Sequence, residues 1–513
     1  MPLLTLVVAA CAEALSQQQH QRQQLLRGDL YLGIDCGTQG TKAVVYDATS
    51  REVVGVGSES YGLIQERRGQ AEQEPRVWEA AMVSACRGAL EAASARSVRG
   101  IGVSGQQHGL VALDEAYEVL RPAKLWCDTE SSGEAEELAS ALGWGIVASF
   151  TATKLLWMKR NEPESWSRLY RVALPHDWLN LRLTGRLVME CGDASGTGLL
   201  DVEAREWDEK AAALVDAALV EKLPPLVAPT DAAGYLLPEM AARLGLAPGT
   251  PVSAGSGDNM MSALGCGVTV QGRAAASLGT SGTLFARSPE AARDPSGVVC
   301  PFLDAAGGGL PLLCTLNCAS VPEEVRKGYG LDRDGIAALA AAEEVGCDGL
   351  SFLPYLVGER TPNWPWASGA LVGLRPGHLA RPGLLYRAAL EGATFSLKKG
   401  IEALADVGVP RCDQLRLVGG GSKSPLWRKI VADACQVQVA VPAQPESAAL
   451  GAALQAAALV AGAADVAEWI RENHDAPVVA TVDPDPALKS AYDQAFELHN
   501  QRGADLFGRP PLL

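Results

Sequence analysis

Two short turns in this sequence share a pattern of glycines and hydroxyl side chains. GTQGT occupies residues 37–41 and GTSGT residues 279–283, each directly after an apolar run. Glycines let successive backbone N–H groups converge on one anion, and threonine hydroxyls add donors, so such a turn suits phosphate oxygens. Either turn alone has an ordinary hairpin as an equally good explanation. Their recurrence favours a polyphosphate held between two facing turns.

Charged and glycine-rich residues accompany these turns. Asp35 precedes the first turn, where its carboxylate could hold Mg²⁺ directly or through water, and Lys42 follows it and could offset phosphate charge. A third glycine run, residues 419–421, lies between an expected strand and an expected helix. It matches neither GxGxxG nor GxxxxGK[ST], so it indicates no Rossmann or Walker site. Backbone at such a helix start can still approach a nucleotide, although a sharp turn is the simpler explanation.

A carboxylate suited to proton transfer lies in the segment PVSAGSGDNMMSA, residues 251–263. Asp258 and Asn259 fall at the expected start of a helix. Asp258 could accept a proton from a substrate hydroxyl, and Asn259 could hydrogen-bond a neighbouring hydroxyl. The alternative is that Asp258 only caps the helix, as its residue type favours.

A mixed cluster of polar side chains follows the strand expected at residues 98–104. Gln106, Gln107 and His108 lie at its end, and Asp128 follows about twenty residues later. Together they offer the donors and acceptors that a polyol needs, and Trp126 could stack on its apolar face. His108 has an alternative role as a hydrogen-bonded structural histidine. Because the six histidines form no HExxH pattern, catalytic zinc has little support.

The elements that position these residues alternate between strands and helices. Residues 31–47 predict a β-hairpin around the first turn, and residues 272–287 predict a second around GTSGT. Helical patterns cover 76–93 and 382–404, and a short strand covers 414–418 before a helix starting near Pro425. The alternation indicates layered α/β domains, and the repeated turn indicates a duplicated domain with a crevice between the copies. We place the boundary near residue 270.

Composition narrows the class of protein. The chain has 513 residues, 48% of them hydrophobic, enough for a sizeable core in two or three domains. A net charge of −16 argues against a nucleic-acid surface, which needs clustered Lys and Arg. Twelve cysteines without a CxxC pair favour reduced thiols in a cytosol-like compartment over a zinc site or a disulfide framework.

The first 29 residues form a separate extension. MPLLTLVVAACAEALS resembles a signal h-region, but no basic n-region precedes it and it is short for a membrane span. Organellar targeting and a disordered extension both stay open. The rest of the chain has no other run of eighteen apolar residues, so we expect no membrane association.

The ordered motifs of this chain resemble those of the FGGY carbohydrate kinases, within the superfamily of sugar kinases, actin and heat-shock ATPases. The resemblance covers residues 31–461 and is strongest to the bacterial-type members that phosphorylate D-xylulose. The matching motifs are GIDCGTQGTK, AEQEPRVW, GQQHG, LWCD, TATKLLW, DASGT, GSGDN, SLGTSGT, FLPYLVGERTP and LVGGGSKSPLWRKIVAD.

The resemblance implies two ribonuclease-H-like (actin-like ATPase) domains that flank a catalytic cleft. Residues 30–269 would bind sugar and 270–465 the nucleotide, with a C-terminal helix and tail over 466–513. ATP and Mg²⁺ would be required, a homodimer is left open, and the expected reaction makes D-xylulose 5-phosphate and ADP in the cytoplasm. Asp258 would be the general base and Asp35 the Mg²⁺-organising carboxylate. The resemblance also implies that the sugar contacts Gln107, His108 and Asn259. The phosphates would contact Thr38, Gln39, Gly40, Lys42, Gly279 and Thr280, and the adenosine would contact Gly420, Gly421 and Ser424.

Four departures from the family pattern bear on this interpretation. Gln107 replaces a usual methionine, Glu130 replaces a frequent arginine, and residues 129–150 form a shortened segment. These three bear on which sugar is preferred. Cys318 and Ala319 stand where glycines usually lie beside the nucleotide, which bears on nucleotide affinity. One alternative is a kinase for D-ribulose, L-xylulose or glycerol, and another is a catalytically weak sugar or nucleotide sensor. A third is an actin-like or chaperone-like ATPase, but the motifs GQQHG, LWCD and GERTP argue against this third alternative.

Overall fold

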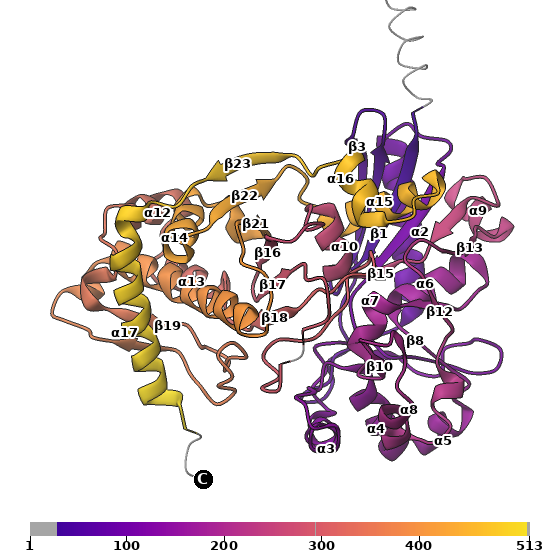
Figure 1. The fold of residues 1–513 in the computed structure, drawn as a ribbon, viewed down its shortest axis with the longest axis horizontal. Helices are drawn as coiled ribbons and strands as arrows, with labels where there is room; N and C mark the ends of the chain where they lie inside the picture. Colours follow the sequence, from indigo (N-terminus) through magenta and orange to yellow (C-terminus); the bar gives the residue numbers. More distant parts are fainter. Residues whose placement is uncertain (1–27, 293, 510–513) are drawn as a thin grey trace, which may run out of the picture.

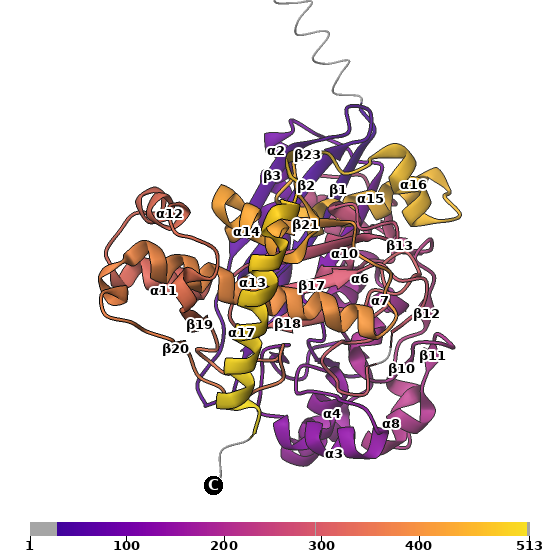
Figure 2. The same cartoon turned by 60° about the vertical axis from the view of Figure 1, so that its left-hand side comes forward.

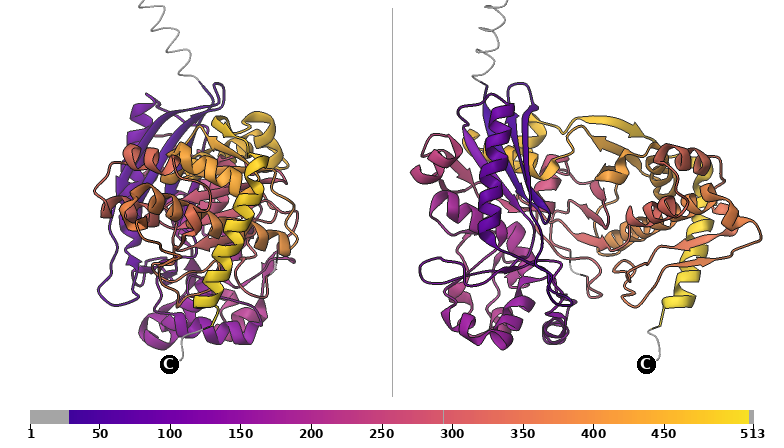
Figure 3. Two further views of the ribbon diagram at one scale, coloured as in Figure 1. Left: turned by 90° about the vertical axis from the view of Figure 1, so that its left-hand side faces the viewer. Right: turned by 180° about the vertical axis from the view of Figure 1, so that it is seen from behind.

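The computed structural model describes residues 28–292 and 294–509, which form two lobes, each built on one twisted sheet (Figure 1). The first sheet has the order β13-β14-β5-β1-β2-β3, with β15 also paired to β5, and the second has the order β18-β17-β16-β21-β22-β23. Seen from behind, the two lobes stand side by side (Figure 3). This two-domain α/β arrangement confirms the predicted fold class.

The two expected hairpins open the two sheets in the same way. β1 (Leu30–Cys36) pairs antiparallel with β2 (Gly40–Asp47), and β16 (Arg273–Leu278) pairs antiparallel with β17 (Gly282–Ala286). In each lobe a third antiparallel strand follows, β3 (Glu52–Ser60) or β18 (Leu312–Thr315). The first strand of each hairpin also pairs in parallel with a later strand, β5 (Gly100–Gly105) or β21 (Gln414–Val418). The repeated topology places both glycine turns at equivalent positions of the two sheets.

The longer helices cover these sheets and agree with the sequence patterns. α2 (Pro75–Ala92) packs on β2 and β3, and α13 (Pro382–Asp406) contacts β17 and β18. Proline at the first position suits both helices, because its missing N–H has no intrahelical partner there. α14 (Pro425–Cys435) begins where expected, and α17 (Lys489–Phe507) lies against α13 (Figure 2).

Helix α15 (Ser447–Ala461) belongs to the second half of the sequence but packs on the first sheet, against β1, β5 and α10 (Asp258–Gly265) (Figure 1). Its alanine-rich sequence and glycines on the facing elements allow this close approach. A Cβ at Gly33 would lie 1.9 Å from the Ala449 carbonyl oxygen, and one at Gly102 would lie 1.9 Å from that of Ala452. The boundary near residue 270 stays a prediction, and the packing of α15 crosses it.

Shorter elements complete the two lobes. Those of the first half are β4 (Glu72–Gln73), β6 (Val111–Leu113), β7 (Ala123–Lys124), α3 (Ser132–Leu142), α4 (Thr151–Asn161), α5 (Pro163–Arg168), β8 (Arg171–Ala173), α6 (Pro175–Thr184), β9 (Met189–Glu190), α7 (Cys191–Ala194), β10 (Leu200–Asp201), β11 (Glu206–Trp207), α8 (Glu209–Val215), β12 (Leu226–Val227), β13 (Ala232–Tyr235), α9 (Pro238–Leu244), β14 (Pro251–Ser253) and β15 (Ser256–Gly257). Those of the second half are α11 (Ser320–Gly328), α12 (Arg333–Ala341), β19 (Ser351–Leu353), β20 (Ala370–Val372), β22 (Gln438–Pro442), α16 (Val466–Asn473) and β23 (Val478–Val482).

The C-terminal region contains more than the expected helix and tail. β23 pairs antiparallel with β22, with Val439 opposite Val482, and so adds an edge strand to the second sheet. Its sequence VVATV is rich in β-branched residues, a pattern that favours a strand.

Two predictions concern the periphery of the molecule. The extension predicted for residues 1–29 lies outside the described residues up to position 27. Among the residues described, no single helix has the length and apolar composition to cross a membrane. The pair α15 and α16 meets these two criteria only when both helices are counted together, and it is bent by 102°. The eleven cysteines of the described segments are free thiols.

Candidate active site

A cavity of about 390 Å³ is lined by residues of both lobes. The first half contributes Asp35, Thr38, Lys42, Gln107, His108, Trp126, Asp258 and Asn259, all of them predicted site residues. The second half contributes Ser277, Ser281 and Thr283 around the GTSGT turn, and Val418 and Gly419 where the third glycine run begins. The structure therefore brings Gln107 and His108 of the polar cluster, the candidate base and parts of all three glycine features to one cleft.

Asp258 is the first residue of α10 and is not its N-cap. Gly257 holds the N-cap position, and no side chain caps this helix. The alternative role of Asp258 as a simple helix cap is therefore not observed. The pKa of Asp258 is raised to about 8, chiefly by burial and also by the charges of Asp35 and Asp193, while hydrogen bonds from Asn259 oppose the shift. A carboxyl group tuned in this way suits proton transfer near neutral pH.

A chain of hydrogen bonds links Asp258 to the polar cluster. The Asn259 Nδ2 group donates to Asp258 Oδ1 at 3.0 Å and to Gln107 Oε1 at 2.7 Å. Gln107 Nε2 lies 3.2 Å from His108 Nε2. Burial, together with the positive charges of Lys154 and Arg360, lowers the pKa of His108 well below its usual value, so the imidazole is neutral.

His108 is held in an uncommon conformation by its surroundings. Its backbone φ is +64°, in the left-handed region that few residues other than glycine adopt, although histidine is enriched there together with Asn and Asp. The imidazole stacks on Phe150, with ring centroids 5.4 Å apart, and meets Phe302 edge-on at 5.1 Å. A Cβ at Gly196 would lie 1.9 Å from His108 Nε2, so the glycine of the DASGT motif leaves room for the ring.

The DASGT segment also supports the strand that leads to the base. Glu190 caps α7 by accepting from the backbone N–H groups of Gly192 at 2.6 Å and Asp193 at 2.7 Å, and it accepts a hydrogen bond from the Ser256 hydroxyl. Asp193 Oδ2 lies 2.7 Å from His176 Nδ1. Since Ser256 is two residues before Asp258, this buried network fixes the backbone that presents the Asp258 carboxyl.

The first glycine turn carries Asp35 and its neighbours into the cleft. Asp35 Oδ1 accepts from the Ser104 hydroxyl at 2.8 Å, and burial raises the pKa of this carboxyl, opposed by that hydrogen bond and by Lys42. Thr38 Oγ1 accepts from Trp126 Nε1 at 2.9 Å. Lys42 Nζ lies 2.6 Å from Glu446 Oε2, just before α15. The turn itself, with Gln39 and Gly40, is closed by a hydrogen bond from the Gly37 N–H to the Gly40 carbonyl at 3.0 Å.

The second turn and the third glycine run have defined supports as well. Gly279 and Thr280 accept backbone hydrogen bonds from Ala319 at 2.8 Å and Cys318 at 3.1 Å. Cys318 is fully buried in the core behind the turn. Its thiol therefore does not replace a glycine surface in the cleft, which removes the main support for a weak nucleotide sensor.

Gly420, Gly421 and Ser424 lie at the start of α14, beyond the Val418–Gly419 wall of the cavity. Ser424 is the N-cap of this helix, and its Oγ accepts from the Trp427 N–H at 3.3 Å. A Cβ at Gly421 would lie 2.5 Å from the Trp427 ring, whereas one at Gly420 would meet no atom within 4 Å. Only Gly420 thus has open space beside it for a ligand.

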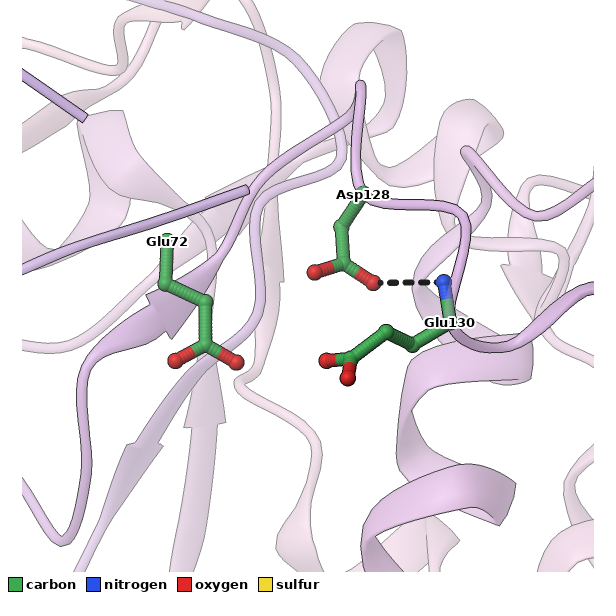
Figure 4. A group of neighbouring side chains, drawn as sticks. All are labelled: Glu72, Asp128 and Glu130. Carbon is green, nitrogen blue, oxygen red and sulfur yellow. Dashed lines mark hydrogen bonds between the residues drawn. The ribbon is translucent and has the colours of Figure 1, made fainter. Parts of the chain in front are cut away.

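Asp128 is not brought to the cavity. Its carboxylate accepts from the Ala71 N–H at 2.9 Å and the Glu130 N–H at 3.1 Å, and it lies beside Glu72 and Glu130 in a group of three carboxylates (Figure 4). The Lys124 ammonium contacts all three carboxylates, at 3.0 Å from Glu72, 3.1 Å from Asp128 and 2.5 Å from Glu130. This buried cation occupies the place that a metal ion would need. Asp128 therefore supports the loop of Trp126 from behind.

The same cluster accounts for Glu130, the acidic residue at a position where the family often has arginine. Glu130 pairs with Lys124 and with Arg67, whose Nε lies 3.1 Å away, and these partners lower its pKa. Its charge is thus compensated inside the protein and does not face the cavity.

Other residues of the cavity were not singled out from the sequence. Arg360 lies in the GERTP motif, whose presence was noted without a role, and Phe302, Cys314, Ser149 and Glu446 lie in segments without a local signal. Arg360 adds a guanidinium to the ammonium of Lys42 in the lining of the cleft, and such cationic donors suit a phosphate site.

The donor set at Asp35 fits a magnesium ion. Asp35 and Asp258 are buried carboxyl groups that line the same cavity, and burial raises the pKa of both. A hard divalent cation prefers such oxygen ligands and would favour their ionised forms.

Comparisons with known proteins place this site in a family. Two duplicated lobes with a hairpin turn at the cleft define the ribonuclease-H-like, actin-like ATPase fold. Residues 30–265 match the N-terminal domain, and residues 274–460 the C-terminal domain, of the FGGY family of carbohydrate kinases. The chain therefore belongs to the FGGY family and is an ATP-dependent carbohydrate kinase.

Sugar kinases from three bacteria are similar to this chain in sequence or in structure. A xylulose kinase from Streptomyces coelicolor is 41% identical over 473 residues, covering 90% of this chain and 94% of the relative. The solved structure of a xylulose kinase from Rhodospirillum rubrum superposes with a TM-score of 0.85 at 28% identity, covering 94% of this chain and all of the other. That of a gluconate kinase from Lactobacillus acidophilus gives the same TM-score at 25% identity, covering 93% and 99%.

Proposed function

We propose that this kinase transfers the γ-phosphoryl group of ATP to the terminal hydroxyl of D-xylulose, giving D-xylulose 5-phosphate and ADP. The observation that carries the proposal is the chain from Asp258 through Asn259 and Gln107 to His108, in the same cavity as the glycine turns. The xylulose kinase relative, at 41% identity, supports this choice of sugar.

Each residue of the cleft receives a role in this reaction. Asp258 accepts the proton of the attacking hydroxyl, and Asn259, Gln107, His108 and Trp126 surround the sugar. The phosphates lie between the two turns, contacted by Thr38, Gln39, Gly40, Lys42, Gly279 and Thr280. Gly420, Gly421 and Ser424 lie on the adenosine side. Mg²⁺ held by Asp35 would supply positive charge to the phosphate oxygens.

The protein side of the mechanism is positioning and charge. As the sugar oxygen forms its bond to phosphorus, the bond from phosphorus to the β-γ bridging oxygen breaks, and the hydroxyl proton moves to Asp258. Lys42, Arg360 and the turn N–H groups stabilise the charge on the transferred group. Closure of the two lobes would exclude water and so limit ATP hydrolysis.

A kinase for another ketopentose or polyol, such as D-ribulose, L-xylulose or glycerol, is the alternative. It is favoured by Gln107, whose amide makes this pocket more polar than the methionine usual in the family. The overall fold does not discriminate, because a gluconate kinase superposes equally well.

The test is an ADP-release assay with Mg·ATP and D-xylulose, D-ribulose, L-xylulose, glycerol or no sugar. We expect D-xylulose to give the highest kcat/KM. A higher value for another sugar would keep the mechanism and refute the proposed substrate. ADP release that no sugar raises above the blank would refute the whole proposal. A cytoplasmic location, a homodimer and the absence of nucleic-acid or membrane partners stay predictions.

A further inference from the structure

We propose that Gln107 is a positioning residue: it fixes the tautomer of His108 and the orientation of Asn259, so that each presents one defined hydrogen-bonding group to the sugar. The role in phosphoryl transfer rests on the proposed function, but the hydrogen-bond chain itself does not. Gln107 joins His108, which follows β5, to Asn259 on α10, 152 residues after Gln107.

The direction of the chain follows from the carboxylate at its end. In the ionised form that the role of base requires, both oxygens of Asp258 can only accept, so the atom of Asn259 that faces Oδ1 at 3.0 Å must be the NH₂ group. The second hydrogen of that NH₂ group points to Gln107 at 2.7 Å, which must therefore present its Oε1. The Gln107 NH₂ group is then left facing His108 at 3.2 Å.

This direction determines the state of His108. Because the Gln107 NH₂ group donates, His108 Nε2 must accept and carry no proton, and the ring proton lies on Nδ1. The buried position of the imidazole, stacked on Phe150, agrees with the neutral form that this requires.

The chain leaves one free group on Asn259 for a ligand. Both hydrogens of the Asn259 NH₂ group are used, by Asp258 and Gln107, so its Oδ1 is the remaining polar atom. A sugar hydroxyl beside Asn259 would therefore donate to it. The Asp258 oxygen that does not contact Asn259 remains available for the proton of the reacting hydroxyl.

Gln107 has little freedom to adopt another arrangement. Its side chain is only 5% exposed. A Cβ at Gly257 would lie 2.6 Å from Gln107 Cγ, so the backbone before Asp258 passes directly against this side chain. Methionine at this position would keep the volume but provide neither the acceptor for Asn259 nor the donor for His108.

The first experiment reads the tautomer without any substrate. Protein labelled with ¹⁵N-histidine is examined by long-range ¹H–¹⁵N correlation, and the His108 signals are assigned by their loss in His108→Asn. We expect an unprotonated Nε2 and a protonated Nδ1 in the wild type, and a protonated Nε2 in Gln107→Glu, whose carboxylate can only accept. A protonated Nε2 in the wild type would overturn the proposal.

The second experiment is a double-mutant cycle with Gln107→Met and Asn259→Leu. We expect Gln107→Met to lower kcat for D-xylulose roughly ten- to a hundredfold while leaving the KM for ATP unchanged. Because Gln107 acts partly through Asn259 and partly through His108, the double variant should lose less kcat than the product of the two single losses. If the two single losses of kcat simply multiplied in the double variant, Gln107 would act independently of Asn259, and the positioning role would be overturned.

Two controls separate this result from other failures. Gln65→Met, at an exposed position, should behave as the wild type, and thermal unfolding of every variant shows whether it is folded. If the wild type phosphorylates none of the sugars, the proposed function fails, whereas the tautomer measurement still decides whether the Gln107 chain exists.

Discussion

Asp258 shows how the environment of a single residue decides its role. At a helix start, an aspartate most often caps the backbone, but here Gly257 is the N-cap. The Asp258 carboxyl is instead directed into a cleft beside Asp35, where burial raises its pKa to about 8. An aspartate at position 257 could cap the helix and stabilise it, whereas at position 258 the carboxyl group is buried at an electrostatic cost.

Asp258→Asn is expected to lower kcat by about two to four orders of magnitude, because the reacting hydroxyl loses its general base. It should not destabilise the fold. Because the pKa of this carboxyl is higher in the folded than in the unfolded protein, the stability of the wild type falls as pH rises from about 4 to about 8. Asparagine does not titrate, so the variant does not lose stability in this way. Without Mg²⁺, the melting temperature of the variant should therefore exceed that of the wild type more at pH 8 than at pH 5.

The control for this variant is Asp332→Asn, at the N-cap of α12, where asparagine caps equally well. It should keep both activity and stability. Asp258→Asn protein that retained the wild-type kcat would remove Asp258 from its role as the base.

At the scale of elements, the contact between α10 and α15 holds Asp258, the proposed base, in place. The two helices touch through small residues: a Cβ at Gly451 would lie 1.9 Å from the Met261 carbonyl oxygen, and one at Gly265 would lie 1.9 Å from that of Ser447. α15 in turn lies on β1, which carries Asp35. One alanine-rich helix therefore connects the elements of both proposed catalytic carboxylates.

Gly451→Ala should destabilise the protein by about 1–3 kcal/mol, because the added methyl group meets backbone that cannot move aside. It should also lower kcat, since α10 carries Asp258 and must shift. Thermal unfolding and the ADP-release assay measure the two effects.

Gly133→Ala in α3 is the matched control, because a Cβ at Gly133 meets no atom within 4 Å. There the change should be neutral or stabilise by up to about 1 kcal/mol, as alanine favours helix. Equal stabilities of the two variants would contradict the close-packing argument.

At the scale of the whole molecule, the C-terminal part of the chain returns to the first lobe and ties the two lobes together. Tyr46 on β2 lies with its hydroxyl 3.1 Å from Nδ1 of His474, directly after α16. Gln455 on α15 accepts from the Gly255 N–H at 2.9 Å and donates to the Ala305 carbonyl at 3.2 Å. Contacts between residues 150 to 428 positions apart thus fix the lobe that carries Asp258.

Acid should weaken this association through His474. Burial lowers the pKa of His474 to about 4, so the folded protein holds it neutral, whereas the unfolded chain protonates it near pH 6.5. The contribution of the neutral imidazole to the free energy of unfolding is fully present above pH 6.5. It is lost as pH falls toward 4, and the loss is about 3 kcal/mol at most. His474→Phe should flatten the dependence of unfolding free energy on pH in this window.

Tyr46→Phe separates titration from the hydrogen bond. It removes the partner hydroxyl and should cost about 1 kcal/mol at pH 8, but it leaves the imidazole to titrate, so the wild-type slope should remain. His474→Phe protein with an unchanged slope below pH 6.5 would show that His474 does not carry the effect.

The sequence by itself determined the local elements and the chemistry that they carry. Both hairpins, the strand Gln414–Val418 and the start of α14 lie where predicted, because periodicity and turn residues act over a few neighbouring positions. The motifs also indicated the base, both phosphate turns and the family. β23 was missed although its β-branched sequence favours a strand, because so short a segment does not show which strand it pairs with.

Tertiary structure alone decided which of these residues meet. It placed α15 on the first sheet, put Lys124 between the carboxylates that include Asp128, and added Arg360 and Phe302 to the cleft. It also made Gln107 the link between His108 and Asn259. These pairings depend on packing between segments far apart in the chain, where burial and the positions of charges are set by the complete fold and not by local sequence.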